Sequence, residues 1–188
     1  MGNEAIMIEI RIHGRGGQGA VTTGQIIAIA ALYDNKYAQT FPLFGVERRG
    51  APVEAFVRMD SSPINLRSQV YNPDVVIVLD PTLVSAVDVT KGLKEKGKMI
   101  INTSKNPKEL KIKGNFDIHT VDASNIAMNI FKRPIVNTPI LGAFSAVTKL
   151  VSFKAMMKAI DEKFIETKGK AMAELNKTAV KEVYDNTK

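Results

Sequence analysis

The stretch Gly14-Arg15-Gly16-Gly17-Gln18-Gly19 governs how the rest of the sequence is interpreted. It follows an alternating apolar run at 6–12 and precedes a segment rich in Ala and Ile at 20–32. This pattern predicts a strand over 6–12 and a helix over about 18–32. Glycines between a strand and a helix let backbone N–H groups crowd toward a ligand, and the helix start adds a positive dipole end. The stretch therefore predicts a site for a phosphate or another anion, with a plain tight turn as the alternative.

Further strands and helices are expected along the whole chain. Period-two and continuous apolar runs predict strands over 37–41, 53–59, 75–79, 98–102 and 116–121. Asp80-Pro81 suggests the start of a helix that runs to about Glu95 and stops at Gly97. Other helices are expected over 123–131, 140–151 and, with amphipathic spacing, 153–164 and 172–183.

This order of elements predicts an α/β fold. Two neighbouring strands without an intervening helix suggest a mixed, mostly parallel sheet in a three-layer α/β/α sandwich with C-terminal covering helices. No linker divides the sequence, so residues 1–188 are expected to form a single domain. In such sheets ligands gather outside the carboxyl ends of the parallel strands, where the glycine stretch is expected to lie.

Composition narrows the class of protein. The 188 residues include no cysteine, which excludes disulfides, a cysteine nucleophile and an iron–sulfur cluster held by cysteines of this chain. The two histidines, His13 and His119, are too few for an ordinary catalytic zinc site. The net charge of +7 favours acidic partners without naming them, and no aromatic or Arg-rich pattern indicates nucleic acid. No apolar run is long enough to span a membrane and no signal peptide is evident, so a cytoplasmic location is expected.

Gly14, Gly16 and Gly19 also fit the G-x-G-x-x-G pattern of dinucleotide sites. That reading requires an acid at the end of the second strand, about 20 residues on, to bind a ribose hydroxyl. Residues 41–43 are Phe-Pro-Leu and offer no carboxylate. A free-standing NADP-dependent reductase stays an alternative, because arginines follow shortly afterward and could meet a 2′-phosphate.

Those arginines belong to a polar loop over 43–52. Glu47, Arg48 and Arg49 stand beside apolar residues, so the loop is either solvated or an interface and anion-binding loop. His13 is either a packed histidine or one that faces a ligand, and His119 is expected to be structural or exposed. No P-loop, Ser–His–Asp arrangement or catalytic acid pair is evident. The chain therefore offers a binding surface without catalytic machinery of its own, which is typical of a subunit.

Four sequence blocks, in this order, resemble the gamma subunit of 2-oxoacid:ferredoxin oxidoreductases, and the loop over 44–53 resembles the pyruvate and branched-chain 2-oxoacid members. The blocks cover about residues 6–150 and comprise the glycine stretch, Phe44 to Val53, Tyr71-Asn72-Pro73-Asp74 with Leu79-Asp80-Pro81, and Asn137-Thr138-Pro139 with Leu141-Gly142-Ala143.

The resemblance implies an enzyme that decarboxylates a 2-oxoacid oxidatively with coenzyme A, giving acyl-CoA and CO2 and reducing ferredoxin. It implies that alpha and beta chains hold thiamine diphosphate and magnesium, that delta and beta chains hold iron–sulfur clusters, and that this chain binds none of these alone. It also implies that the gamma chain docks on its partners and takes part in coenzyme A binding.

Together with the residues themselves, this suggests Gly14, Arg15, Gly16, Gly17, Gln18 and Gly19 as contacts for coenzyme A. Glu47, Arg48 and Arg49 are expected at an interface or beside a phosphate. A pure assembly scaffold, whose glycine stretch packs against a partner chain, is the further alternative.

Overall fold

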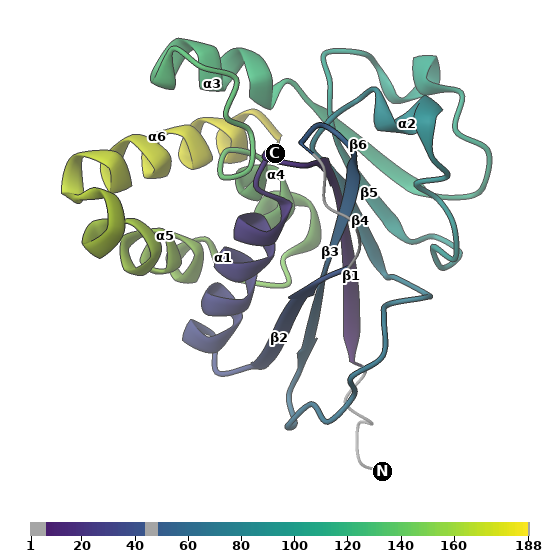
Figure 1. Cartoon of the computed structure of the whole chain (residues 1–188), viewed down its shortest axis with the longest axis horizontal. Helices are drawn as coiled ribbons and strands as arrows, with labels where there is room; N and C mark the ends of the chain where they lie inside the picture. Colours follow the sequence, from purple (N-terminus) through teal and green to yellow (C-terminus); the bar gives the residue numbers. More distant parts are fainter. Residues whose placement is uncertain (1–6, 44–48, 188) are drawn as a thin grey trace.

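A mixed β-sheet forms the centre of the structure, a computed structural model that describes residues 7–43 and 49–187 (Figure 1). Within these ranges the sheet has six strands in the order β2-β3-β1-β4-β5-β6. The strands are β1 (Ile8–Arg15), β2 (Tyr37–Pro42), β3 (Pro52–Asp60), β4 (Val75–Val78), β5 (Lys98–Asn102) and β6 (Asp117–Val121). Only β3 runs against its neighbours, and the other described strands share one direction. The predicted mixed, mostly parallel sheet is confirmed.

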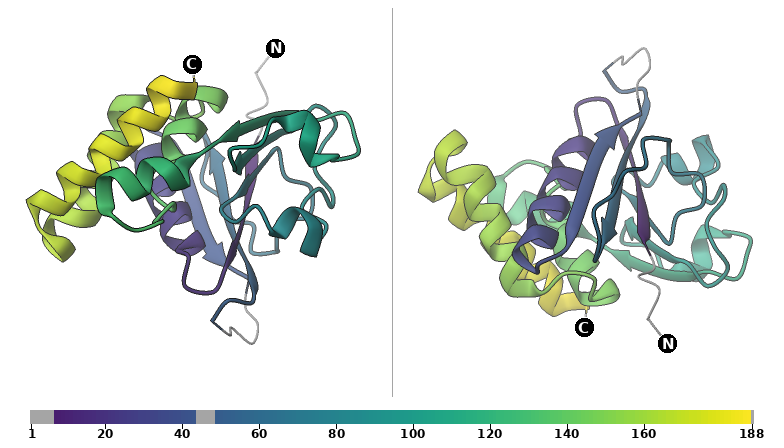
Figure 2. Two further views of the ribbon diagram at one scale, coloured as in Figure 1. Left: turned by 90° about the horizontal axis from the view of Figure 1, so that it is seen from above. Right: turned by 90° about the horizontal axis from the view of Figure 1, so that it is seen from below.

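Long helices cover one face of this sheet, with α5 and α6 outermost (Figures 1 and 2). They are α1 (Ala20–Tyr33), α3 (Ala123–Phe131), α4 (Ile140–Thr148), α5 (Phe153–Lys168) and α6 (Lys170–Thr187). Ile10, Ile12 and Val57 turn their side chains toward this layer and join one continuous apolar core with it. The predicted C-terminal covering helices are confirmed, and none of the helices in the described ranges is long and apolar enough to cross a bilayer.

The opposite face carries a thinner cover. Val76, Val78, Met99 and Ile101 alternate with the residues of the main core and form a second apolar cluster. Over it lie α2 (Leu83–Ala86), the 3₁₀ helix η1 (Pro107–Leu110) and the turns between them. The alternation of buried side chains on both faces explains why the central strands read as continuous apolar runs.

The helix predicted from Pro81 to about Glu95 is wrong. The structure has only the four-residue α2, which begins after Thr82, and the chain is extended at Val87. The Asp80 carboxylate accepts from the N–H and hydroxyl of Thr82 instead of capping a longer helix. Farther on, Asp88 binds Thr90 in the same way, and Gly92 adopts a φ of 71°. These local side-chain bonds compete with helical hydrogen bonds and hold the segment as turns.

Other boundaries differ less. The helix expected over 140–151 ends at Thr148, because Lys149 takes a left-handed conformation (φ 54°). The start of α3 is as predicted, since Asp122 caps it by accepting from the N–H of Asn125.

Candidate functional site

The glycine stretch forms the turn between β1 and α1, at the carboxyl end of the parallel strands. Gly17 has a φ of 91° and Gly19 one of 83°, in the left-handed region that favours glycine. Gly19 is also the N-cap of α1. The N–H groups of Gly17, Gly19 and Ala20 donate to no group in the described part of the chain. The turn therefore presents free donors at a helix start, the arrangement that binds anions.

Gly14 and Gly16 serve the packing of this turn. A Cβ on Gly14 would lie 3.3 Å from Leu79 Cδ1 and 3.4 Å from the Ala20 Cβ, so Gly14 is closely packed between Leu79 and the start of α1. The N–H of Gly16 donates to the Ala51 carbonyl at 2.8 Å, and the Gly16 carbonyl accepts from the Gly50 N–H at 3.1 Å. The glycine stretch is thus joined to the segment that leads into β3.

Arg15 is neutralised within the site. Its Nε lies 3.2 Å from Asp80 Oδ2, and its other nitrogens donate to Thr82 Oγ1 at 2.7 Å and to the Gly50 carbonyl at 3.1 Å. Burial raises the pKa of Asp80, but hydrogen bonds from Thr82 and Gln18 and the charge of Arg15 bring it below its ordinary value. Asp80 is therefore ionised at neutral pH and offsets the Arg15 charge.

The side chain of Gln18 stabilises the turn through two hydrogen bonds. Its Oε1 accepts from the Arg15 N–H at 2.7 Å, and its Nε2 donates to Asp80 Oδ2 at 2.8 Å. These two bonds tie the loop to the end of β4 and fix its backbone.

A cavity of about 230 Å³ opens beside the loop. Its walls come from the glycine turn, the first turn of α1 and the start of β3: Arg15, Gly16, Gly17, Gly19, Ala20, Val21, Val53 and Glu54. Four of the residues suggested as ligand contacts thus share one cavity, while Gly14 and Gln18 lie behind it as supports. The volume is smaller than the roughly 300–1,000 Å³ of a complete small-molecule site. The cavity can hold one part of a ligand the size of coenzyme A.

Glu54 is the residue of this cavity that sequence reasoning missed. Strand register places it opposite His13, and its Oε1 lies 3.5 Å from His13 Nδ1. Burial raises the pKa of Glu54, with Arg11 and Lys91 acting in the other direction. In the sequence, only the position of Glu54 shortly after the polar loop over 43–52 could have indicated that it lines this cavity.

His13 is a packed histidine. It is 2% exposed, and its Nε2 accepts from Arg11 Nε at 3.0 Å. Burial, reinforced by the Arg11 charge, lowers the pKa of His13 to about 3, so the ring is neutral. His119 lies elsewhere, on β6, with its Nε2 2.8 Å from Asp117 Oδ1.

The polar loop over 43–52, which carries Arg48 and Arg49, contacts the glycine turn through its last residues, which the structure describes. Arg49 is exposed and precedes Gly50 and Ala51, which are bonded to Gly16. Glu47 and Arg48, suggested as interface or phosphate residues, lie outside the described residues.

The segment before α4 also reaches the start of α1. A Cβ on Gly19 would lie 2.7 Å from Asn137 Nδ2, and the Asn137 carbonyl accepts from Thr23 Oγ1 at 2.8 Å. The last of the four sequence blocks is thereby packed against the first.

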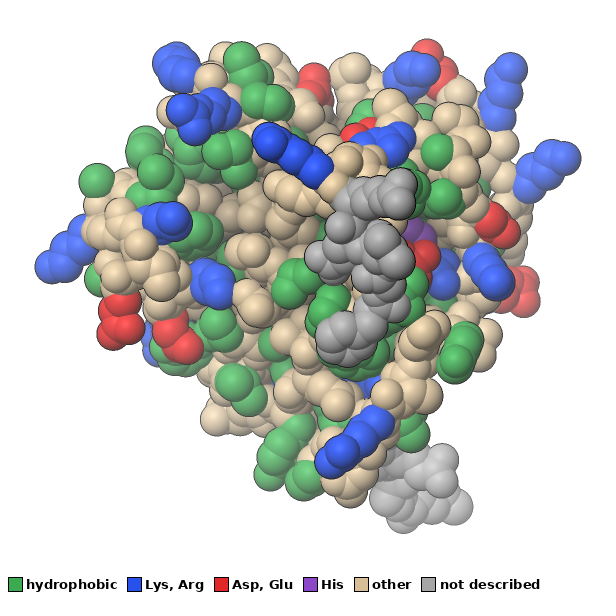
Figure 3. Space-filling view, viewed as in Figure 1, with side chains coloured by type: hydrophobic (Ala, Val, Ile, Leu, Met, Phe, Trp, Pro, Cys, Tyr) green, Lys and Arg blue, Asp and Glu red, His purple; other side chains and the backbone are tan. Residues whose placement is uncertain are grey.

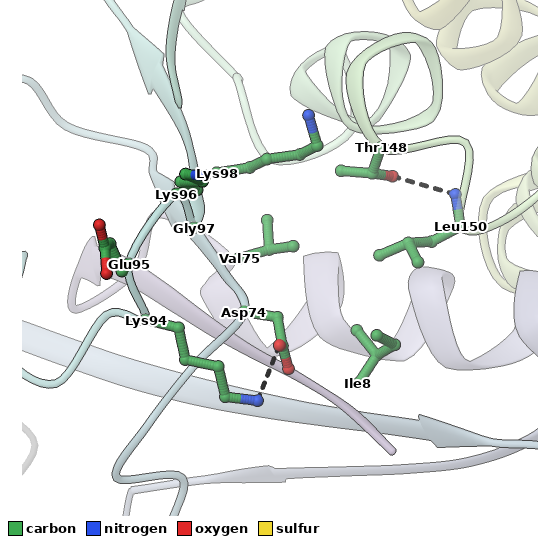
Figure 4. A pocket seen from close by; sticks show the side chains of 10 residues that line it. All are labelled: Ile8, Asp74, Val75, Lys94, Glu95, Lys96, Gly97, Lys98, Thr148 and Leu150. Carbon is green, nitrogen blue, oxygen red and sulfur yellow. Dashed lines mark hydrogen bonds and ion pairs between the residues drawn. The ribbon is translucent and has the colours of Figure 1, made fainter. Parts of the chain in front are cut away.

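A second cavity, of about 270 Å³, lies at the other edge of the sheet, where the strands begin (Figure 4). Ile8, Val75 and Leu150 line it together with lysines, of which Lys94 is paired with Asp74 at 2.7 Å. No group of three or more His, Cys, Asp or Glu residues with metal-binding geometry occurs among the described residues.

Comparisons with known proteins give a consistent family. The family model "Pyruvate ferredoxin/flavodoxin oxidoreductase" matches residues 9–186. Pyruvate synthase subunit PorC of Methanothermobacter thermautotrophicus is 53% identical over 177 residues, covering 94% of this chain and 96% of that protein. The "Pyruvate/ketoisovalerate oxidoreductases common subunit gamma" of Pyrococcus furiosus is 50% identical over 184 residues, covering 96% and 97%.

A solved structure agrees. The crystal structure of pyruvate oxidoreductase subunit PORC from Thermotoga maritima superposes with a TM-score of 0.81 at 41% identity, covering 95% of this chain and 96% of that one.

Proposed function

The chain belongs to the pyruvate ferredoxin/flavodoxin oxidoreductase family as a gamma subunit, and we propose that its glycine turn contributes to coenzyme A binding in the assembled enzyme. The subunit is part of a pyruvate synthase or related 2-oxoacid oxidoreductase. In the proposed reaction a 2-oxoacid, pyruvate by preference, is oxidatively decarboxylated with coenzyme A to acyl-CoA and CO2, and ferredoxin takes the electrons.

The observation that carries the coenzyme A role is the row of N–H groups at Gly17, Gly19 and Ala20, which have no partner among the described residues. All three residues line the cavity, and Gly19 and Ala20 stand at the positive end of α1. Coenzyme A carries a pyrophosphate and a 3′-phosphate, and either could accept these hydrogen bonds. Arg15 contributes by shaping the turn, because Asp80 balances its charge.

In this proposal the redox chemistry belongs to alpha, beta and delta subunits. They would hold thiamine diphosphate, magnesium and the iron–sulfur clusters and would receive ferredoxin. The sequence of the gamma chain has no cysteine with which to ligate a cluster. Its own part is to dock on these partners and to complete the coenzyme A site from one side.

Calorimetric titration of the assembled complex with coenzyme A tests the proposal. A Cβ on Gly17 meets no atom within 4 Å, so Gly17→Ala places a methyl group at the cavity without a clash. The matched control is Gly169→Ala, because Gly169 also has open space and a positive φ of 85° but lies between α5 and α6. Both variants place a side chain at a positive φ, and Gly169, with a ψ of 162°, lies in the region that is essentially confined to glycine.

We expect Gly17→Ala to weaken coenzyme A binding by about tenfold, because the methyl group would keep the phosphate from approaching the N–H groups, which costs roughly one hydrogen bond to a charged group. Gly169→Ala should bind as the parent complex does. Equal affinity of the two variants would refute the coenzyme A role and leave this chain as an assembly subunit.

A further inference from the structure

Helix α5, in the outer helix layer, carries a stripe of exposed charges (Figure 2). This α5 stripe consists of Lys154, Lys158, Glu162 and Glu166, which recur at intervals of four residues and so lie along one oblique row of the helix surface. None of the four forms an ion pair among the described residues. The first half of the stripe is positive, the second half is negative, and both halves are open to a partner.

The order of these charges does not stabilise the helix itself. The helix dipole favours acids in the first turn and bases in the last, but Lys154 lies in the first turn of α5 and Glu166 in the last. A Glu followed four residues later by a Lys stabilises a helix more than the reverse order does, and here Lys158 precedes Glu162. The order of the charges therefore points to a contact outside the helix.

Apolar side chains lie beside the middle of the α5 stripe. A cavity of about 540 Å³ is lined there by Tyr33, Lys158, Asp161, Glu162, Ile165 and Glu166. Tyr33 is 43% exposed and Ile165 is 37% exposed. The Tyr33 hydroxyl donates to Glu162 Oε2 at 2.8 Å, and Lys158 Nζ lies 5.3 Å from the centre of the Tyr33 ring. Tyr33 is thus held next to the two central charges, where a protein interface commonly places an aromatic residue.

Two copies of the α5 stripe are complementary to each other. When α5 packs antiparallel on α5 of a second copy, about a two-fold axis midway between Lys158 and Glu162, Lys158 faces Glu162 of the other copy. By the same symmetry Lys154 faces Glu166 of the other copy. Rows of residues four apart align when two helices cross at about −50°, the commonest packing class in globular proteins. The two-fold axis makes each of these ion pairs form twice.

We propose that the α5 stripe is a docking surface for a second copy of this chain. The two copies pack α5 against α5 about a two-fold axis, with opposite charges facing each other and with Tyr33 and Ile165 of both copies beside them. A partner surface of a single sign would be repelled by one half of the stripe, whereas a second copy matches both halves. This contact between gamma chains does not depend on the coenzyme A function proposed above.

Sedimentation equilibrium of the full chain and of two charge-reversed variants tests the proposal. Lys154→Glu/Lys158→Glu makes the stripe wholly acidic, and Glu162→Lys/Glu166→Lys makes it wholly basic. The parent should form dimers, and each variant alone should self-associate about tenfold or more weakly, because attractive exposed pairs become repulsive. An equal mixture of the two variants should form dimers again, since each charge then faces an opposite one. The control Glu95→Lys, on the exposed turn before β5, should dimerise as the parent does.

A parent chain that stays monomeric at high micromolar concentration would overturn the proposal, as would a mixture that associates no better than its components. The acidic variant has a lower net positive charge than the parent. Stronger self-association of that variant would therefore show that overall charge controls association and that the stripe does not. If the parent is monomeric and the variants lose affinity for the other subunits of the enzyme, the stripe docks on a different chain and the proposal fails.

Discussion

The glycines of the turn serve two different purposes: some allow a backbone conformation that favours glycine, and others allow close packing. Gly17 and Gly19 have positive φ values, whereas a Cβ on Gly14 would be in tight contact with the end of the Leu79 side chain. A pattern of glycines in sequence predicts the turn but not this division. The neutralisation of Arg15 by Asp80 was equally out of reach, because the two residues are far apart in the chain and meet only through the parallel pairing of β1 and β4.

His13 gives a prediction at the same scale. Its pKa is about 3 in the folded chain, because of burial and the Arg11 charge, against an ordinary value near 6.5. Between these values the unfolded chain binds a proton that the folded chain does not, so stability falls as pH drops from about 7 toward 3. For one proton the slope is up to about 1.4 kcal/mol per pH unit.

Urea unfolding of the chain between about pH 4.5 and pH 7.5 measures this dependence. His13→Gln, which does not titrate, should lose less stability on acidification than the parent, by up to that slope. Parallel pH profiles for the two proteins would show that His13 does not contribute as described.

At the scale of elements, helix α4 contains a glycine, Gly142, whose lack of a side chain lets α4 pack closely against α6. A Cβ on Gly142 would lie 2.2 Å from the Val180 carbonyl oxygen and 2.7 Å from the Tyr184 nitrogen, so α4 packs directly on the backbone of α6. Gly142→Ala should therefore lower the free energy of unfolding by roughly 1–3 kcal/mol, the usual cost of overpacking.

Urea unfolding measures this change too, with Glu95→Ala on the exposed turn before β5 as control. The control should stay within about 0.5 kcal/mol of the parent. If Gly142→Ala were equally stable, the close approach of α4 and α6 would be wrong.

Elements were predictable where local pattern and tertiary contact agree. The buried runs of β4 and β5 and the amphipathic spacing of α5 and α6 gave the right type of element. The segment after α2 failed because Arg11, distant in sequence, donates to the carbonyls of Val89 and Lys91 and holds them outside a helix. Such contacts leave no periodic trace in the segment that they shape.

For the whole molecule, sheet order decides what the site contains. The sequence indicates a mixed sheet, but it does not say that β3 lies between β1 and β2. That insertion moves the end of β2 away from the glycine turn and brings Glu54 to it. On the face shown in Figure 3, Lys and Arg side chains are scattered among Asp, Glu and apolar side chains and form no single patch.

Amide hydrogen exchange of the assembled complex, with and without coenzyme A, tests the central claim most directly. The N–H groups of Gly17, Gly19 and Ala20 have no partner among the described residues, so a bound phosphate would protect them. The account predicts slower exchange in residues 16–21 on addition of coenzyme A, and no change at the turn around Gly169. Unchanged exchange in residues 16–21, in a complex that binds coenzyme A, would contradict it.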